Sequence, residues 1–398
     1  MHAAVIVLGD LGRSPRMQFH ALALASDGIT VDLIGEEGTP VPTRVLQHPR
    51  IRVSRLTPRR GWTGVIGSAL ALCLACRRLP RPDVIIAQTP PAIPTLVVTW
   101  VIARLRGSRL IIDWHNLGWT LLAVRFGADH PFVRVARWLE RQSSSLADAH
   151  LAVSDALAHH VQTEWGLTHV RVLRDRPADA QSAPDAAVAM REQLIRSAGL
   201  AAHEQPAVVI SPTSWTRDEA LDLVMSAADC LEQMWSDDGP ADGLVIVVSG
   251  EGSGRAAFEA QVRTRTPRRV RIVTTFVSAD DYPSLVAAAD AGLSLHRSSS
   301  GLDLPMKICD MFGAGLPVCA LDYGPTLREL VTPDRNAVVF QDATELASCL
   351  DRWFCAWPQR SDAWQRLHAG AADVAAGPRW TDGWRREARA LIVEAESV

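Results

Sequence analysis

The residues with the clearest chemical pattern lie at 298–318, where small and polar residues follow an apolar run and lead into a proline and a lysine. Backbone N–H groups of residues 299–303, and of a helix starting near Pro305, could point at a phosphate, which the helix dipole favours. Lys307 would lie in the first turn, where a cation opposes the dipole unless an anion is beside it. It is also the only lysine of the chain. Asp310, on the same helix face, could accept hydrogen bonds from a ribose diol.

An ordinary capped helix is the alternative for this stretch. Asp303 and Lys307 stand four residues apart, so they could form a pair on the helix surface. Such a pair would stabilise the helix by only ~0.2–0.5 kcal/mol. The residues alone leave the phosphate site and the structural helix open.

A second phosphate-type loop follows the first apolar run, residues 4–10. Ser14 and Pro15 are favourable N-cap and first-turn residues for the helix that comes next. Arg13 and Arg16 flank the start of that helix, where the dipole disfavours cations. This loop is predicted to bind a phosphate or diphosphate, and arginines solvated at a helix start are the structural alternative.

A candidate for proton transfer lies at the end of the apolar run 110–113. On an extended strand Asp113 and His115 would point to the same side, at the edge where open α/β sheets bind ligands. Such a couple can orient an imidazole or serve as a general base. Asn116 opens the following loop, and a histidine bonded to a carbonyl group as part of the fold is the alternative.

Short apolar runs alternate with helical patterns along the chain, which predicts an α/β protein with parallel, doubly wound sheets. The first set of expected strands covers residues 4–10, 31–35, 51–56, 84–87, 110–113, 151–153 and 170–173. The second set covers residues 207–211, 244–249, 270–275, 292–295, 317–320 and 338–340. We therefore expect domains at 1–175 and 206–377, a linker at 176–205 with one helix near 186–198, and a helix over 378–398 that packs back on the first domain.

Composition describes a folded protein without a global preference for nucleic acid, because the 398 residues are 47% hydrophobic and 21% charged with a net charge of −3. Residues 38–82 are locally basic and could meet anionic lipid headgroups or a phosphorylated acceptor, although a solvated surface is the alternative. Their nine arginines are Arg44, Arg50, Arg52, Arg55, Arg59, Arg60, Arg77, Arg78 and Arg81. Seven cysteines without metal-ligand spacing favour a reducing cytoplasm and no metal site. No apolar run reaches the ~20 residues that span a bilayer, so we expect a cytoplasmic or peripheral membrane protein.

Several motifs together closely resemble the chitobiosyldiphosphodolichol β-mannosyltransferase family, which adds the first mannose to the lipid-linked N-glycan precursor. They are residues 9–20 (GDLGRSPRMQFH), 112–116 (IDWHN), 213–216 (TSWT), 281–283 (DYP) and 298–318. The likeness runs along nearly the whole chain in order. It implies a GT-B fold, in which two Rossmann-like doubly wound domains face each other across a cleft. Against eukaryotic members of that family, we expect a bacterial-type homologue without their amino-terminal membrane anchor.

The resemblance implies an inverting, metal-independent and cofactor-free transfer of mannose from GDP-mannose to a GlcNAc-terminated polyprenyl diphosphate through a β-1,4 linkage. The matched positions for the donor are Ser214, Trp215, Gly250, Gly252, Ser299, Ser300, Gly301, Leu302, Asp303, Lys307 and Asp310. Those for the acceptor are Gly12, Arg13, Ser14, Arg16, His20 and Asn116. Lys307 would neutralise the leaving diphosphate, Asp310 would hold the ribose, and Asp303 could hold mannose hydroxyls.

The general base is expected to be Asp113 or His115, with Asp10 as the third candidate. Three other functions remain open from the sequence. They are a retaining GT-B transferase that uses another nucleotide sugar, a GT-B-like nucleotide-sugar epimerase, and a non-catalytic lipid-sugar binding subunit.

Overall fold

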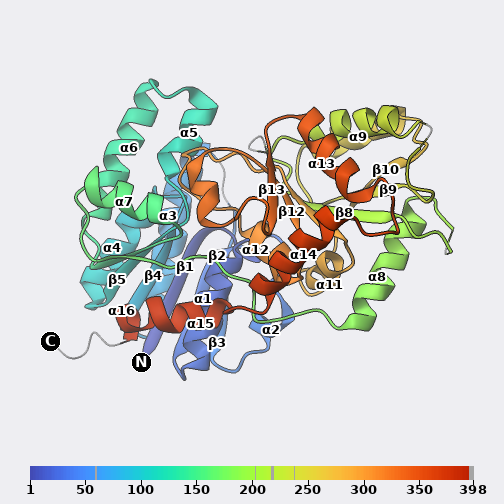
Figure 1. Ribbon diagram of the computed structural model, residues 1–398. Coiled ribbons are helices and arrows are strands. Elements are labelled where there is room, and N and C mark those ends of the chain that lie inside the picture. Colours follow the sequence, from blue (N-terminus) through green and yellow to red (C-terminus); the bar gives the residue numbers. More distant parts are fainter. Residues whose placement is uncertain (59–60, 202, 217–218, 237, 394–398) are drawn as a thin grey trace. The chain divides into compact units, whose positions relative to one another are not determined.

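The computed structural model describes residues 1–398 except 59–60, 202, 217–218, 237 and 394–398 (Figure 1). By its internal contacts the chain divides into two compact units. Unit 1 comprises Met1–Asp175, Leu302–Leu304 and Trp380–Val398, and unit 2 comprises Arg176–Gly301 and Pro305–Arg379. The strands of each unit form their own sheet, so each unit has its own layered core.

Unit 1 is built on a seven-stranded parallel sheet with the strand order β3-β2-β1-β4-β5-β6-β7. The strands are β1 His2–Asp10, β2 Thr30–Glu36, β3 Ile51–Leu56, β4 Val84–Thr89, β5 Arg109–Trp114, β6 Ala149–Ala152 and β7 Val170–Val172. The central residues of β1, β2, β4, β5 and β6 are buried, as near-continuous apolar strands require, whereas the edge strands β3 and β7 are partly exposed. The strand order reverses between β1 and β4, which places the switch point of the sheet there.

Helices cover both faces of this sheet (Figure 1), as expected when right-handed crossovers lead in opposite directions from the switch point. The helical segments are η1 Leu11–Arg13, α1 Pro15–Ser26, α2 Thr43–Leu46, α3 Gly61–Arg78, α4 Thr95–Arg106, α5 Gly118–Phe126, α6 Pro131–Ser144, α7 Asp155–Thr163, α15 Trp380–Glu387 and α16 Arg389–Val393. The helices α3 and α4 pack on one face through Leu72, Cys76 and Ile102, while α1 and α15 pack together on the other.

Unit 2 repeats the plan with a six-stranded parallel sheet in the order β10-β9-β8-β11-β12-β13. The strands are β8 Ala207–Pro212, β9 Leu244–Ser249, β10 Val270–Thr275, β11 Ala291–Ser294, β12 Val318–Leu321 and β13 Ala337–Phe340. The helical segments are α8 Pro184–Ser197, α9 Asp222–Met234, α10 Arg255–Thr264, α11 Tyr282–Ala287, α12 Met306–Gly313, η2 Pro325–Glu329, α13 Ala343–Phe354 and α14 Asp362–Ala375. The order reverses between β8 and β11.

The α/β architecture and all thirteen expected strands are confirmed, each within two residues of its expected ends. Helix α12 begins at Met306, one residue after the expected proline, which takes the N-cap position. Helix α8 begins at Pro184 in the stretch expected as a linker, and it packs within unit 2. No helix among the described residues is long and apolar enough to cross a membrane.

The carboxyl-terminal segment contributes two tryptophans to the core of unit 1. Trp380 and Trp384 on α15 are buried, and the Trp380 ring lies 5.6 Å from Phe19 and 5.1 Å from His20 on α1. The indole Nε1 of Trp384 donates to His20 Nδ1 at 3.2 Å. The expected helix over 378–398 is two helices, α15 and α16, and its residues 394–398 lie outside the described part of the chain.

Trp384 is therefore predicted to stabilise unit 1 both by packing and by one buried hydrogen bond. Trp384→Ala should lower the free energy of unfolding by about 3–5 kcal/mol, because it leaves a cavity. Trp384→Phe keeps most of the ring volume and should cost about 1–3 kcal/mol for the buried acceptor left without a donor. Urea unfolding measures both, with exposed Trp138→Ala as the control. Equal losses in all three variants would contradict the assignment.

Candidate functional site

The parallel strands of unit 2 bring several polar loops to one edge of its sheet. The segments after β8, β9 and β11 all leave from the carboxyl ends of their strands. Open α/β sheets bind ligands at this edge, next to the switch point, which in unit 2 lies between β8 and β11. The loops after these two strands are joined, because Glu219 and His296 form an antiparallel bridge and Ala220 N donates to Leu295 O at 3.0 Å.

Lys307 lies at this switch point and forms an ion pair with Glu219. Helix α12 buries Ile308, Met311 and Phe312 in the core, so Lys307 and Asp310 occupy its less buried face. The other carboxylate oxygen of Glu219 accepts from the Thr213 hydroxyl. The Glu219 side chain is 3% exposed and that of Lys307 is 18% exposed. The ammonium group is thus held in place but remains within reach of a ligand.

The expected donor residues on the β8 and β9 loops pack tightly against each other. A Cβ atom at Gly250 would collide with the Thr213 carbonyl oxygen, and one at Gly252 with the carbonyl oxygen of Ser214. Gly250 also has a φ of 147°, which other residues rarely adopt. Trp215 is buried at 3%, and its indole Nε1 has no hydrogen-bond partner. Only glycines allow this close backbone approach.

The remaining donor candidates surround the start of α12. Gly301 N donates to Ser298 Oγ at 2.7 Å, and Gly301 O accepts from Thr326 Oγ1 at 2.6 Å, which fixes the serine loop. Burial and then the charge of Asp310, which is hydrogen-bonded to the phenol, raise the pKa of Tyr282 well above its usual value. The remaining serines of the loop, Ser299 and Ser300, are half-buried. Leu302 and buried Asp303 belong to the short segment that groups with unit 1.

In unit 1 the loop after β1 is organised by Asp10. Its carboxylate accepts from Gly12 N at 3.0 Å, from Thr39 N at 3.0 Å and from Thr39 Oγ1 at 2.7 Å. Arg13 lies on the outside of this loop and donates to Thr39 Oγ1 at 3.2 Å. Ser14 occupies the expected N-cap position of α1, but its hydroxyl donates to Asp10 O at 2.9 Å and does not cap the helix.

Arg16 and His20, two of the residues predicted to bind the acceptor, are buried inside unit 1. The Arg16 guanidinium makes two hydrogen bonds to Asp113, at 2.7 and 2.8 Å, and one to Asp175 at 2.7 Å. His20 Nε2 lies 3.2 Å from Asp113 Oδ2. Burial alone would raise the pKa of Asp113, but the Arg16 charge and these hydrogen bonds lower it. Burial lowers the pKa of His20 despite Asp113. The two carboxylates of Asp113 and Asp175 stabilise the Arg16 cation.

His115 and Asn116 follow β5 at the same edge of the sheet. His115 N donates to Thr89 O at 2.9 Å, which joins the ends of β5 and β4 near the switch point. The His115 ring is half-buried and its Nδ1 has no partner. Asn116 is buried, and its Oδ1 accepts from Leu117 N at 2.7 Å. Of the three base candidates, His115 is therefore the one whose side chain is not already committed to an ion pair or to holding a loop.

Two acidic residues of these edges were not found from the sequence. Glu219 lies far from Lys307 along the chain, and no spacing rule connects them. Glu140 on α6 is 1% exposed and caps the start of α5, accepting from Gly118 N at 2.8 Å and Trp119 N at 2.9 Å. Burial raises the pKa of Glu140 to about 7, although these backbone donors oppose the shift. The sequence signal that could have identified Glu140 is that it is the single acidic residue of an amphipathic helix whose other charged residues are arginines.

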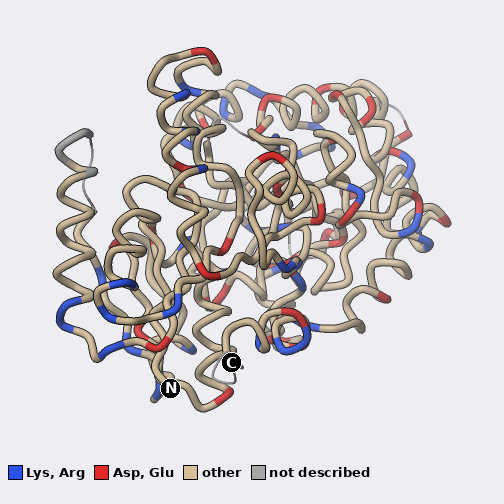
Figure 2. Tube along the Cα trace, turned by 90° about the vertical axis from the view of Figure 1, so that its left-hand side faces the viewer, with Lys and Arg blue, Asp and Glu red and all other residues tan. Residues whose placement is uncertain are grey.

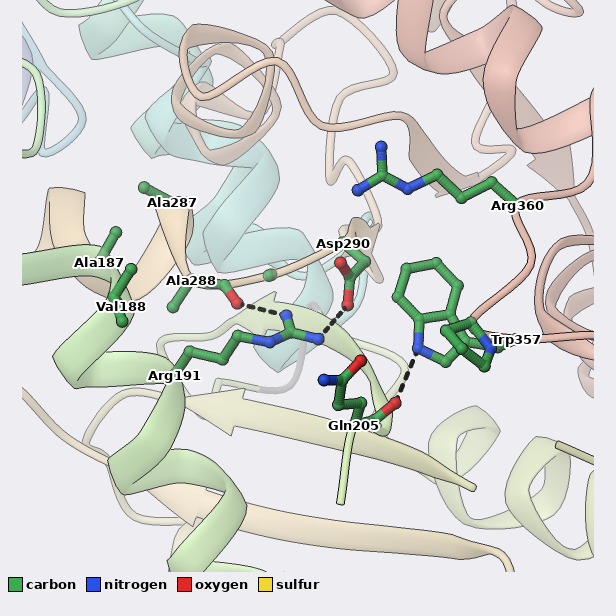
Figure 3. Close-up of a pocket in the computed structure, with 11 residues that line it drawn as sticks. Ala187, Val188, Arg191, Gln205, Ala287, Ala288, Asp290, Trp357 and Arg360 are labelled. Carbon is green, nitrogen blue, oxygen red and sulfur yellow. Dashed lines mark hydrogen bonds and ion pairs between the residues drawn. The ribbon is translucent and has the colours of Figure 1, made fainter. Parts of the chain in front are cut away.

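A separate cavity of about 470 Å³ lies within unit 2 at the opposite edge of its sheet (Figure 3). Asp290 and Gln205, which line it, precede the starts of β11 and β8. Arg191 from α8 reaches Asp290 Oδ2 at 2.9 Å and Ala288 O at 2.9 Å, and Trp357 Nε1 donates to Gln205 O at 2.9 Å. These bonds join α8 to the sheet edge, so the cavity is a feature of packing and not of the loop site.

The raised pKa of Glu140 predicts a pH dependence of stability. Because the folded pKa of about 7 exceeds the usual 4.5, its contribution is fully present below pH 4.5 and is lost as the pH rises through 7. The loss should be on the order of 3 kcal/mol. In urea unfolding at pH 5 and pH 8, the stability difference between wild type and Glu140→Gln should shift by this amount against the wild type. A difference that does not change with pH would contradict the assignment.

Two family models match the chain, and each falls on one of the sheets. The model described as a glycosyl transferase 4-like domain matches residues 14–174, and the one described as glycosyl transferases group 1 matches residues 207–355. A crystal structure of a glycosyltransferase from Rickettsia africae aligns with a TM-score of 0.65 over 97% of this chain and 96% of that one, at 12% identity. This alignment supports the fold, which is GT-B.

Curated relatives match over nearly the full length. The chain is 34% identical to a chitobiosyldiphosphodolichol beta-mannosyltransferase of Pongo abelii, over 99% of this chain and 93% of that protein. It is 31% identical to the UDP-glycosyltransferase TURAN of Arabidopsis thaliana, over 99% of this chain and 98% of that protein. Identity at this level over both units shows that the chain belongs to the chitobiosyldiphosphodolichol beta-mannosyltransferase family and is a glycosyltransferase.

Proposed function

We propose that the protein transfers mannose from GDP-mannose, with inversion, to a GlcNAc-terminated glycan on a polyprenyl diphosphate. The full-length match at 34% identity to a relative named for this transfer carries the proposal. The edge of unit 2 supports it, because a positioned ammonium group at the switch point suits a nucleotide diphosphate. A GlcNAc-terminated lipid-linked glycan is then the acceptor.

For the donor, Lys307 would neutralise charge on the departing diphosphate, together with the amides of the Ser299–Gly301 loop and the α12 dipole. Asp310 would accept hydrogen bonds from the ribose hydroxyls while Tyr282 orients its carboxylate. Asp303 would contact mannose hydroxyls. No group of three or more His, Cys, Asp and Glu side chains in the described residues is arranged to hold a metal ion. We propose that Lys307, the loop amides and the α12 dipole supply the positive charge at the diphosphate, so that the transfer needs no metal ion.

For the acceptor, we propose that His115 removes the proton from the attacking hydroxyl. Inversion requires attack on the anomeric carbon from the side opposite the leaving diphosphate, so the base must sit beside the acceptor. The Asp113 carboxylate is paired with Arg16, and the Asp10 carboxylate accepts hydrogen bonds from Thr39, so neither is available as the base. Arg13, Gly12 and Asn116 are proposed to line the acceptor side. Arg16 and His20 would act indirectly, by holding Asp113 beneath this edge.

A second candidate is transfer from a UDP-sugar, because one relative with the same coverage is named a UDP-glycosyltransferase. The two are separated by incubating the protein with a short-chain polyprenyl diphosphate chitobiose and either GDP-mannose or a panel of UDP-sugars. We expect turnover with GDP-mannose and a β-linked product by NMR. An α-linked product would contradict inversion, and turnover with a UDP-sugar alone would assign the second candidate.

We expect the rate of sugar transfer from the donor to depend on Lys307. Lys307→Met should lower kcat by about 10²–10³-fold, the cost of losing one charge-stabilising group. Removing Lys307 alone leaves the buried Glu219 carboxylate without its cation, so Lys307→Met/Glu219→Gln serves as the matched variant. The double variant should recover the melting temperature and remain inactive. Near-normal rates in both variants with GDP-mannose would exclude Lys307 from the diphosphate site.

His115→Gln should lower kcat by about 10²–10⁴-fold with little change in KM, as expected for a general base. Asp113→Asn is the contrasting variant, because it leaves Arg16 with an incomplete buried pair and should lower the melting temperature. Steady-state kinetics and thermal unfolding of both variants separate the two roles. Unchanged kcat in His115→Gln would return the role of base to the aspartates.

A further inference from the structure

Four neighbouring helices of unit 1 carry most of the large hydrophobic side chains on the described surface. Eleven of the 17 that are exposed lie on α3–α6. Those on α3 and α4 are Ile66, Leu70, Leu74, Val97, Val101 and Leu105. Within each helix they are four residues apart, so each set lies along one helix face. The other five are Leu121, Val124, Phe126, Val135 and Trp138.

The four helices that carry these side chains pack one against the next, and we call the eleven side chains together the apolar helix face. Helix α3 packs against α4, α4 against α6, and α6 against α5. Leu105 is 81% exposed and Trp138 60% exposed, so the side chains are not partly covered core residues. Single exposed hydrophobic residues are ordinary, but a set on adjacent helices marks a contact surface.

The exposed charges on these four helices have one sign, although exposed Asp129 lies in the loop between α5 and α6. The exposed arginines of α3–α6 are Arg77, Arg78, Arg104, Arg125, Arg134, Arg137 and Arg141. The single acidic residue of these helices, Glu140, is buried beneath α5. In Figure 2, which views this side, α3 is the helix at the left edge, uncharged along its turns and blue at its lower end. The net charge of the whole chain is −3, so this surface is a local exception.

The basic stretch 38–82 is only partly available for such a role. Arg44 lies over the Phe19 ring, Arg50 and Arg81 donate to backbone carbonyls, and Arg52 pairs with Asp32. Arg59 and Arg60 lie outside the described residues. Arg77 and Arg78, at the end of α3, are exposed on the same helix as Ile66, Leu70 and Leu74 of the apolar helix face.

We infer that the apolar helix face docks unit 1 on a bilayer that contains anionic lipid. Aliphatic and aromatic side chains would enter the boundary between headgroups and acyl chains, while the arginines meet lipid phosphates. A second copy of this chain would bring two cationic faces together, which disfavours a symmetric dimer. Nucleic acid offers no apolar surface to match the exposed leucines. The inference rests on unit 1 alone and not on the sugar that is transferred.

Sedimentation with vesicles tests the inference on the full chain. Vesicles of phosphatidylcholine with phosphatidylglycerol should bind the wild type at low salt, and binding should weaken as salt is added. Leu70→Gln/Leu74→Gln/Leu105→Gln should lower the partition coefficient by at least about tenfold. The matched control is Val188→Gln/Met234→Gln/Phe276→Gln, which changes three exposed hydrophobic residues of unit 2 and should bind normally.

A second readout follows Trp138 directly. Lipids that carry a nitroxide on the acyl chain should quench fluorescence in the wild type, and Trp138→Phe should remove much of that quenching. Circular dichroism and the melting temperature confirm folding of each variant, and thermal stabilisation by GDP-mannose reports donor binding separately. Failure of the wild type to bind these vesicles, or unchanged binding of the α3–α4 variant, would overturn the inference. A dimer in light scattering that this variant disrupts, without vesicle binding, would assign the face to a second copy.

Discussion

Parallel strand pairing is the constraint on which the rest of this protein depends. All strands of a parallel sheet present their carboxyl ends at one edge, so loops far apart in the sequence meet there. In unit 2 this edge joins residues 213–216, Glu219, residues 250–254 and residues 295–301, which no local interaction would bring together. In unit 1 it joins the Asp10 loop with the ends of β4 and β5. Burial of apolar strand residues between the helix layers stabilises this arrangement of parallel strands.

Each unit fixes its edge with one ion pair that is withdrawn from water. In unit 1, the Arg16 guanidinium donates hydrogen bonds to both carboxylate oxygens of Asp113 and to one of Asp175. These three side chains are at most 1% exposed. In unit 2, Lys307 pairs with Glu219 but stays partly open. The first pair can only hold structure, because every polar atom of Asp113 is occupied. The second leaves room for a ligand, which is the physical reason why we assign it to the donor.

The surface of unit 1 adds a different kind of constraint. Helices α3 and α4 pack on the sheet, α6 packs on α4, and α5 packs on α6, yet these helices still expose leucine, valine and isoleucine side chains. A lipid-linked substrate stays at a membrane. An enzyme that docks on the membrane searches for this substrate along a surface and not through a volume. Docking through helix faces needs no spanning segment, and no described helix of the chain could form one.

The sequence by itself determined the α/β class, the strands and the residues of the β1 and β11 loops. These follow from apolar periodicity and from helix-start chemistry, both of which are local along the chain. The near-complete motif 298–318 also pointed to the family that the relatives later confirmed. The tertiary structure decided which polar and charged groups are available to a substrate, because this depends on hydrogen-bond and ion-pair partners that are distant in sequence. It placed Arg16 and His20 in the core beside Asp113, paired Lys307 with Glu219, and left His115 Nδ1 unpartnered. Burial of a charge is set by packing between elements, and no spacing along the chain reports it.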